Sequence, residues 1–158
     1  MSEHRFGLGF DSHPGEVGKP LFLGGVYFEG EAGLAGHSDG DAVCHAVADA
    51  LLGAASLGDI GEHFPDDDPS TAGIVGRELL GRAVALTVTA GLLPWSCDVT
   101  IIADRPKFAG RRDEMRHAIA EVLEVPIERV SVKATRPEGL GLVGDGAACI
   151  ALAVLTRS

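Results

Sequence analysis

The segment from Ala148 to Leu155 constrains the fold most, because every side chain in it is apolar. A strand with one face in water alternates apolar and polar residues, whereas a continuous apolar run is typical of a central strand with both faces covered. Strand-like and helix-like segments alternate through the second half of the chain. This alternation predicts a single domain over residues 1–158 with an α+β or α-β sandwich fold, in which helices cover one face of a mixed β-sheet. The other face, which carries Phe10 and this last strand, would need a partner.

Shorter patterns give the remaining elements. From Arg5 to His13, apolar residues alternate with small or polar ones, as in a half-buried strand. Stretches rich in Ala and Leu predict helices, and Asp39 or Asp41 would cap the first of them. We expect strands at 5–13, 21–23, 26–28, 97–103, 130–135 and 148–155, helices at 42–55, about 74–90 and about 109–123, and a loop at 56–70.

The charge balance excludes some functional classes. The formal net charge is −10, so the chain lacks the basic face that a general nucleic-acid-binding protein needs, and we expect no nucleic-acid partner. No apolar run is long enough for a membrane span, so we expect no membrane partner. The three cysteines form no CxxC pair, and the first residues contain no signal-like apolar stretch. Both features favour reduced thiols and a cytoplasmic location.

Three side chains are candidate metal ligands. Asp11 and His13 are two residues apart on a predicted strand and therefore project from the same face. His45 lies one turn into the first predicted helix. One carboxylate and two imidazoles suit zinc, and three protein ligands leave a fourth position open, as in catalytic sites. Asp41 and Asp49 share a helix face with His45, so a carboxylate could orient its ring. Alternatively, His45 is an ordinary boundary residue.

Two kinds of segment could hold phosphates. The acidic, glycine-containing stretches Gly58–Gly61 and Phe64–Asp68 could present backbone N–H groups and carboxylates to a sugar phosphate, although a solvated loop has the same composition. Ala103–Lys107 and Lys133–Gly141 each follow a predicted strand, where ligands collect in open sheets. An arginine in the last segment could bind a phosphate through two hydrogen bonds, and a glutamate could hold a divalent cation. Surface connections with basic residues are the alternative.

Taken in order, these motifs resemble the 2-C-methyl-D-erythritol 2,4-cyclodiphosphate synthase family of the non-mevalonate isoprenoid pathway. The resemblance extends over nearly the whole chain, and the combination of H-S-D-G-D, L-G-D-I-G and F-P-D is its most specific part. The matching segments are Gly9–His13, Leu23–Val26, His37–Asp41, His45, Ala50–Ala54, Leu57–Gly61, Phe64–Asp66, Asp98–Ala103, Pro106–Lys107, Val132–Thr135, Glu138 and Leu140–Gly141.

The resemblance implies a homotrimer whose sheets pack around a threefold axis, with active sites between subunits. It implies one Zn²⁺ per subunit on Asp11, His13 and His45, and a second divalent ion, Mg²⁺ or Mn²⁺, held by Glu138 and bridging the substrate phosphates. The small-molecule substrate would be 4-diphosphocytidyl-2-C-methyl-D-erythritol 2-phosphate. Its 2-phosphate would attack the β-phosphorus, so that the cyclic diphosphate forms and CMP leaves. The chain would therefore be a phosphorus-oxygen lyase.

The resemblance also implies roles for individual residues. His37 and Arg136 would steady the phosphates in the transition state as catalytic residues. The residues implied to bind substrate are Asp11, His13, His37, Ser38, Asp59, Ile60, Gly61, Phe64, Asp66, Asp68, Ala103, Arg105, Pro106, Lys107, Thr135, Arg136, Glu138 and Leu142.

The chain departs from the family pattern at three places. Arg136 stands where a second threonine is usual, Leu142 stands where an aromatic residue is usual, and Asp145 stands where an arginine is usual. Three copies of Asp145 would meet around the threefold axis that the resemblance implies, and their negative charges would repel an isoprenoid diphosphate. We therefore expect no isoprenoid diphosphate to bind at this axis. Two alternative functions remain, a zinc- and nucleotide-binding family member without turnover and a zinc phosphohydrolase.

Overall fold

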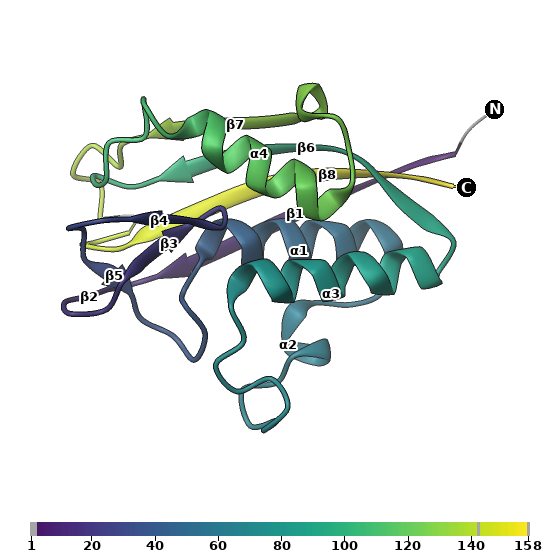
Figure 1. Cartoon of the computed structure of the whole chain (residues 1–158), viewed down its shortest axis with the longest axis horizontal. Helices are drawn as coiled ribbons and strands as arrows, with labels where there is room; N and C mark the ends of the chain where they lie inside the picture. The colour runs from purple at the N-terminus through teal and green to yellow at the C-terminus, as the bar shows by residue number, and fades with distance from the viewer. Residues whose placement is uncertain (1–2, 142, 158) are drawn as a thin grey trace.

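The computed structural model describes residues 3–141 and 143–157, and its centre is a four-stranded mixed sheet with the strand order β1-β8-β6-β7 (Figure 1). These strands are β1 (His4–His13), β6 (Leu92–Ile102), β7 (Val130–Thr135) and β8 (Ala147–Arg157). β8 pairs antiparallel with both β1 and β6, and β6 runs parallel to β7. The apolar segment is therefore part of a central strand, as the sequence predicts.

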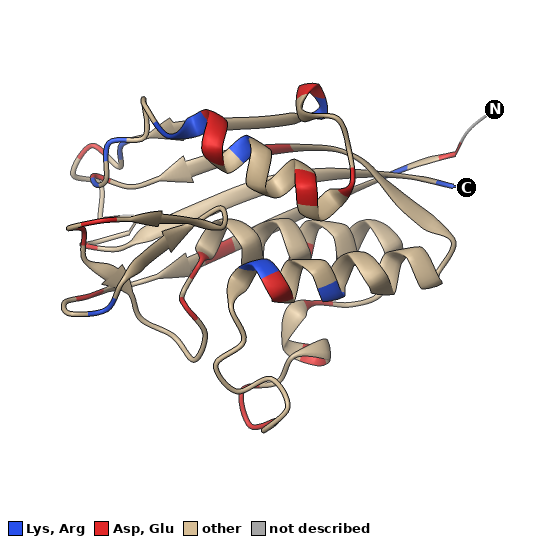
Figure 2. Ribbon diagram, in the orientation of Figure 1, with Lys and Arg blue, Asp and Glu red and all other residues tan. Residues whose placement is uncertain are grey.

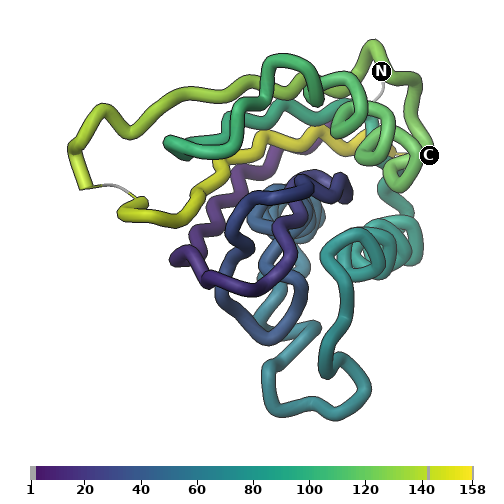
Figure 3. Tube along the Cα trace, turned by 60° about the vertical axis from the view of Figure 1, so that its left-hand side comes forward, coloured from purple at the N-terminus to yellow at the C-terminus, as the bar shows by residue number. Residues whose placement is uncertain are grey.

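Three long helices cover one face of this sheet (Figures 1 and 3). They are α1 (Ala42–Ala55), α3 (Gly76–Thr89) and α4 (Arg112–Leu123). α1 packs on β1 and β8, α3 packs beside α1, and α4 packs against β7. Within the described ranges, no helix is long and apolar enough to cross a membrane.

Shorter elements surround the sheet. Two small two-stranded sheets lie on the side of α1, and a short helix follows α1. They are β2 (Gly15–Glu16) with β5 (Gly33–Leu34), β3 (Leu21–Leu23) with β4 (Val26–Phe28), and α2 (Ile60–His63), while the 3-10 turn η1 (Ile127–Arg129) precedes β7. The sequence predicts a loop from 56 to 70, so α2 is a difference. It forms because the Asp59 carboxylate accepts a hydrogen bond from the Glu62 N–H and caps the turn.

Several boundaries also differ from the expected ones. α3 begins at Gly76 rather than near Ile74, and α4 begins at Arg112 rather than near Ala109. β6 begins at Leu92 rather than at Cys97. A bulge between Pro94 and Ser96 absorbs the proline, which explains why the simple alternation of the strand is lost there.

The sheet face opposite the helices is bare and apolar. Phe6, Leu8 and Phe10 of β1 are 67%, 70% and 57% exposed, and Ile150 and Leu152 of β8 are 39% and 42% exposed. This is the face that the sequence predicts would need a partner, and no part of the described chain covers it. An exposed apolar surface of this kind is typical of an interface between proteins.

Two glycines let α1 lie directly on β1. A Cβ atom at Gly7 would come within 1.9 Å of the Ala50 carbonyl oxygen, and one at Gly9 would come within 1.9 Å of the Ala46 carbonyl oxygen. Only a residue without a side chain allows this approach. The backbones of strand and helix therefore touch, and this contact sets the separation between residues at the end of β1 and those in the first turns of α1.

The Asp41 carboxylate fixes the start of α1. It is fully buried, and its two oxygens accept hydrogen bonds from four backbone N–H groups, those of Gly24, Gly25, Val43 and Cys44. It therefore caps the helix and also ties the β3–β4 turn to it. Asp39, two residues earlier, plays a similar role. Its carboxylate accepts a hydrogen bond from the backbone N–H of Gly76 at the start of α3.

We expect Asp41→Ala to lower the free energy of unfolding by about 2–3 kcal/mol, because buried N–H donors lose their acceptor. Asp41→Asn should cost less, since one oxygen serves three of the four donors. Urea unfolding followed by circular dichroism measures both. Equal midpoints for Asp41→Ala and the parent chain would contradict this role.

Candidate metal centre and ligand cavities

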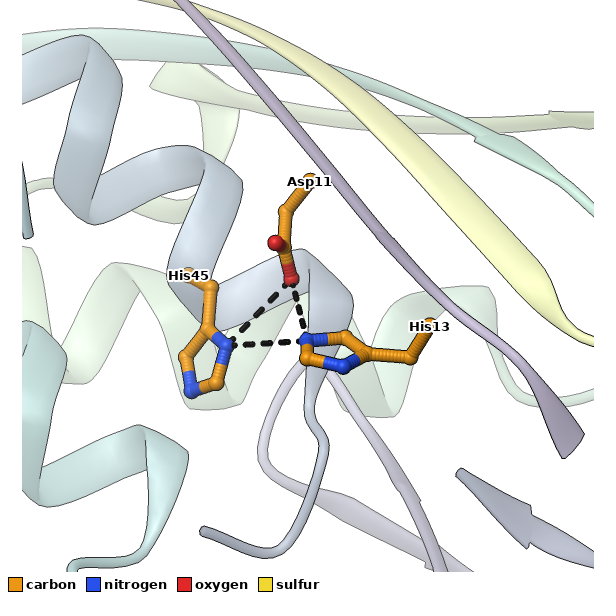
Figure 4. Close-up of side chains that lie close together, drawn as sticks. All are labelled: Asp11, His13 and His45. Carbon is orange, nitrogen blue, oxygen red and sulfur yellow. Dashed lines mark hydrogen bonds and ion pairs between the residues drawn. The ribbon is translucent and has the colours of Figure 1, made fainter. Parts of the chain in front are cut away.

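Asp11, His13 and His45 converge at the end of β1 (Figure 4). Asp11 Oδ2 lies 2.7 Å from His13 Nε2 and 3.3 Å from His45 Nδ1, and the two ring nitrogens are 3.3 Å apart. Ligands of a tetrahedral zinc ion, at bond lengths of about 2.0–2.1 Å, are separated by about 3.3 Å. Two of the three separations match this value and the third is shorter, so the side chains converge closely enough to hold one small cation.

The buried oxygen of Asp11 supports a cation. Within residues 3–141 and 143–157, no donor of good hydrogen-bond geometry serves Asp11 Oδ2, and such an atom is costly without a partner. Burial alone would raise the pKa of Asp11, but the adjacent imidazoles of His13 and His45 outweigh it and hold the pKa at about 2. The carboxylate is thus ionised at neutral pH and can bind a metal. The adjacent Asp11 carboxylate raises the pKa of His13, although burial opposes it.

The outer nitrogen of His45 contacts a hydroxyl group rather than a carboxylate. Ser38 Oγ lies 3.1 Å from His45 Nε2. The interpretation that Asp41 or Asp49 orients this ring is not borne out by the geometry, because both carboxylates bind backbone groups elsewhere. Asp41 caps α1, and Asp49 accepts from the Ile60 N–H at the start of α2. Helical spacing predicts a shared face but does not show which donors the carboxylates serve.

A cavity of about 610 Å³ opens beside this cluster. It lies between the metal cluster, the loop before α1, and the segment from α2 to the start of α3. Of the residues predicted to bind metal or substrate, those lining it are Asp11, His13, His37, Ser38, His45, Ile60, Gly61, Phe64 and Asp66. The sequence interpretation missed Gly36, Pro65, Leu79 and the run Thr71–Ile74, which also line it. These small or apolar residues carry no chemical signal that distinguishes them from ordinary loop residues.

A second cavity of about 480 Å³ lies at the ends of the parallel strands β6 and β7. The predicted substrate residues that line it are Ala103, Pro106, Lys107, Thr135 and Arg136. Phe108 and Arg112 line it too and were not predicted. An adjoining hollow of about 460 Å³ contains Arg105, whose guanidinium pairs with Glu31.

The two cavities differ in charge. Figure 2 shows basic residues around the ends of β6 and β7 and near the start of α4, and acidic residues in the loops around α2. The described lining of the metal cavity contains no Lys or Arg, and it shares no residue with the second cavity. One chain thus keeps its candidate metal ligands and its candidate phosphate-binding cations in separate places.

Comparison with known proteins identifies the family. The model of the YgbB family matches residues 4–157. The chain belongs to the YgbB family.

The relatives have informative names. A 2-C-methyl-D-erythritol 2,4-cyclodiphosphate synthase of Idiomarina loihiensis is 50% identical over 153 residues, which cover 96% of each chain. A bifunctional enzyme IspD/IspF of an Anaeromyxobacter species is also 50% identical over 96% of this chain, but the chain spans only 39% of that relative's length. A solved 2C-methyl-D-erythritol-2,4-cyclodiphosphate synthase in its CDP-bound form matches with a TM-score of 0.89 and 35% identity, covering 96% of this chain and 99% of that one.

The remaining predicted residues of this YgbB-family chain lie outside both cavities, and their roles stay predictions. The Asp59 carboxylate caps α2, and the Asp68 carboxylate accepts from the Ser70 N–H. Glu138 is exposed on the loop between β7 and β8. Leu142 lies outside the described residues. Asp145 Oδ1 lies 3.4 Å from the Gly15 N–H, which donates to it.

Proposed function

We propose that the chain converts 4-diphosphocytidyl-2-C-methyl-D-erythritol 2-phosphate to 2-C-methyl-D-erythritol 2,4-cyclodiphosphate and releases CMP. The observation that carries this proposal is the convergence of Asp11, His13 and His45, with ligand spacing suited to zinc, beside a cavity large enough for a small molecule. YgbB-family relatives that match over nearly their whole length bear the name of this synthase. The reaction would use residues 1–158 as one domain, and we propose a cytoplasmic location.

The chemistry needs positive charge, because the attacking phosphate and the diphosphate are both anionic. A zinc ion held by Asp11, His13 and His45 would supply Lewis-acid polarisation of phosphate oxygens. His37, at the mouth of the metal cavity, would donate a hydrogen bond to a phosphate oxygen. Glu138 would hold a second divalent ion, Mg²⁺ or Mn²⁺. These interactions would hold attacking oxygen and phosphorus in line.

The second cavity suits the nucleotide end of the substrate. Lys107 and Arg136 supply positive charge at its rim, and Ala103, Pro106 and Phe108 supply an apolar floor. Thr135 offers a hydroxyl group. Ligands bind preferentially at the carboxyl ends of parallel strands, and this cavity lies at the ends of β6 and β7. We propose that it holds cytidine and the adjacent phosphate.

A homotrimer would bring the two cavities together. One chain separates the metal cluster from the cations that would neutralise a diphosphate, so a complete site requires residues from two copies. The bare face of Phe6, Leu8, Phe10, Ile150 and Leu152 provides an apolar surface that a closed threefold assembly would bury. We therefore propose active sites between neighbouring subunits, with the sheets packed around the axis.

Phosphorus NMR of the products tests the function directly. Purified protein with Zn²⁺ and Mg²⁺ should convert the substrate to a cyclic diphosphate and CMP in equal amounts. Free inorganic phosphate instead would indicate a phosphohydrolase, and unchanged substrate with bound nucleotide would indicate a family member without turnover. Either of these results would overturn the proposal.

Arg136→Ala should lower kcat/KM by roughly tenfold to a hundredfold. The guanidinium lines the second cavity, and losing a charge-assisted hydrogen bond to phosphate costs about 1.5–3 kcal/mol. Arg136→Lys should recover part of the lost kcat/KM, because lysine keeps the positive charge but cannot form a bidentate hydrogen bond to a phosphate. Steady-state kinetics with Arg82→Ala on α3 as a control measure the effect. Unchanged kinetics for Arg136→Ala would mean that this side chain only points to solvent.

A further inference from the structure

Ser38 has a hydrogen-bonding pattern that substrate binding alone does not explain. Its Oγ lies 3.1 Å from His45 Nε2 and accepts a hydrogen bond from the Gly40 N–H at 3.1 Å. The His45 side chain is only 7% exposed, so water cannot easily replace the hydroxyl group. Ser38 also lines the metal cavity.

Counting protons and lone pairs gives the serine a definite role. His45 faces Asp11 and His13 with Nδ1, so a metal bound there needs the Nδ1 lone pair and leaves the ring proton on Nε2. That proton needs an acceptor, and the Ser38 oxygen is within reach. A serine oxygen has two lone pairs, and the Gly40 N–H and the His45 Nε2–H use both. The hydroxyl proton of Ser38 is then free to donate into the cavity.

The same loop contacts the other histidine. The backbone at Gly36 lies against the His13 ring, because an added Cβ there would approach that ring to 3.3 Å. Lys19 Nζ donates to the Gly36 carbonyl oxygen at 2.9 Å and ties the loop to the β2–β3 connection. One short segment, from Gly36 to Ser38, therefore lies against both imidazoles.

We infer that Ser38 is a positioning residue, whose hydroxyl oxygen fixes the orientation and the protonated nitrogen of His45 while its proton faces the cavity. The inference rests on the proposed metal site and gives Ser38 a task beyond the substrate contact expected from its motif. Partners that orient a ligating histidine in this way typically change metal affinity by about 10- to 100-fold when removed.

The test compares the full-length parent chain with Ser38→Ala and Ser38→Thr. Competition with a chelating dye should show zinc affinity lowered about 10- to 100-fold in Ser38→Ala and restored in Ser38→Thr, which keeps the hydroxyl group. Side-chain ¹H–¹⁵N spectra of the zinc-loaded parent should show a His45 Nε2–H protected from exchange with water, and this protection should be lost in Ser38→Ala. Thr89→Ala, which removes an exposed hydroxyl at the end of α3, should match the parent.

The outcomes separate this inference from the proposed function. If Ser38→Ala keeps the parent's zinc affinity and a protected Nε2–H while KM rises, Ser38 binds substrate only and the inference fails, although the metal site stands. If the parent chain binds no zinc, the proposed metal site itself fails, and the inference fails with it. Lowered affinity in both Ser38→Ala and Ser38→Thr would also overturn the inference, because the hydroxyl group would not be the cause.

Discussion

Replacing His45 with alanine is expected to remove both the proposed zinc ion and the proposed synthase activity. Three side chains hold the proposed ion, and two remaining ligands rarely hold zinc tightly. His45 reaches Asp11 and His13 from α1, while both partners lie on β1 (Figure 4). Of the described residues in this cluster, only His45 lies on α1. The substitution therefore removes the ligand that the helix supplies.

Metal analysis and the phosphorus NMR assay measure the two effects on the same sample. His117→Ala is a matched control, because His117 is exposed on α4 and lines neither cavity. It should keep full zinc content and turnover. Full stoichiometric zinc in pure, folded His45→Ala protein would show that the ligand assignment is wrong.

Gly9→Ala should also strongly lower zinc affinity and turnover, because it displaces α1 rather than removing a ligand. The new methyl group would lie 1.9 Å from the Ala46 carbonyl oxygen, and neither backbone can yield without separating α1 from β1. We expect a loss of about 1–3 kcal/mol or more in stability. Displacing a catalytic group by about 1 Å can cost about a hundredfold in rate, so His45, next to Ala46, should lose its alignment.

Gly53→Ala provides the control, because a Cβ there meets nothing within 4 Å. Alanine should stabilise this exposed helical position by about 0.5–1 kcal/mol. Thermal unfolding, zinc affinity and turnover should therefore separate the two variants clearly. Gly9→Ala protein with the parent's stability and zinc affinity would show that the helix is free to move at no cost.

The metal cluster could be predicted because its signals are local. Asp11 and His13 share a strand face by simple alternation, and His45 lies in a recognisable helix. The sheet, its central strand and the three long helices followed from apolar patterns in the same way. The YgbB family membership agrees with the resemblance seen in the motifs.

Other features depend on contacts that sequence spacing does not encode. Asp41 has the helical spacing of a partner for His45, yet it serves four backbone N–H groups. The short helix α2 was hidden in an acidic segment. The sequence indicates that the face of β1 and β8 needs a partner, but an apolar pattern does not reveal what that partner is.

The direct contact between β1 and α1 separates two properties of this fold that substitutions could change. The distance between the ligands on β1 and the ligand on α1 is set by two backbones in contact, with no side chain between them at Gly7 and Gly9. No residue of α4 or β7 lines the metal cavity, so substitutions that repack the apolar residues between these two elements should change thermal tolerance without retuning the proposed metal site. Evolution or engineering can adjust heat resistance and ion affinity as separate traits in this fold.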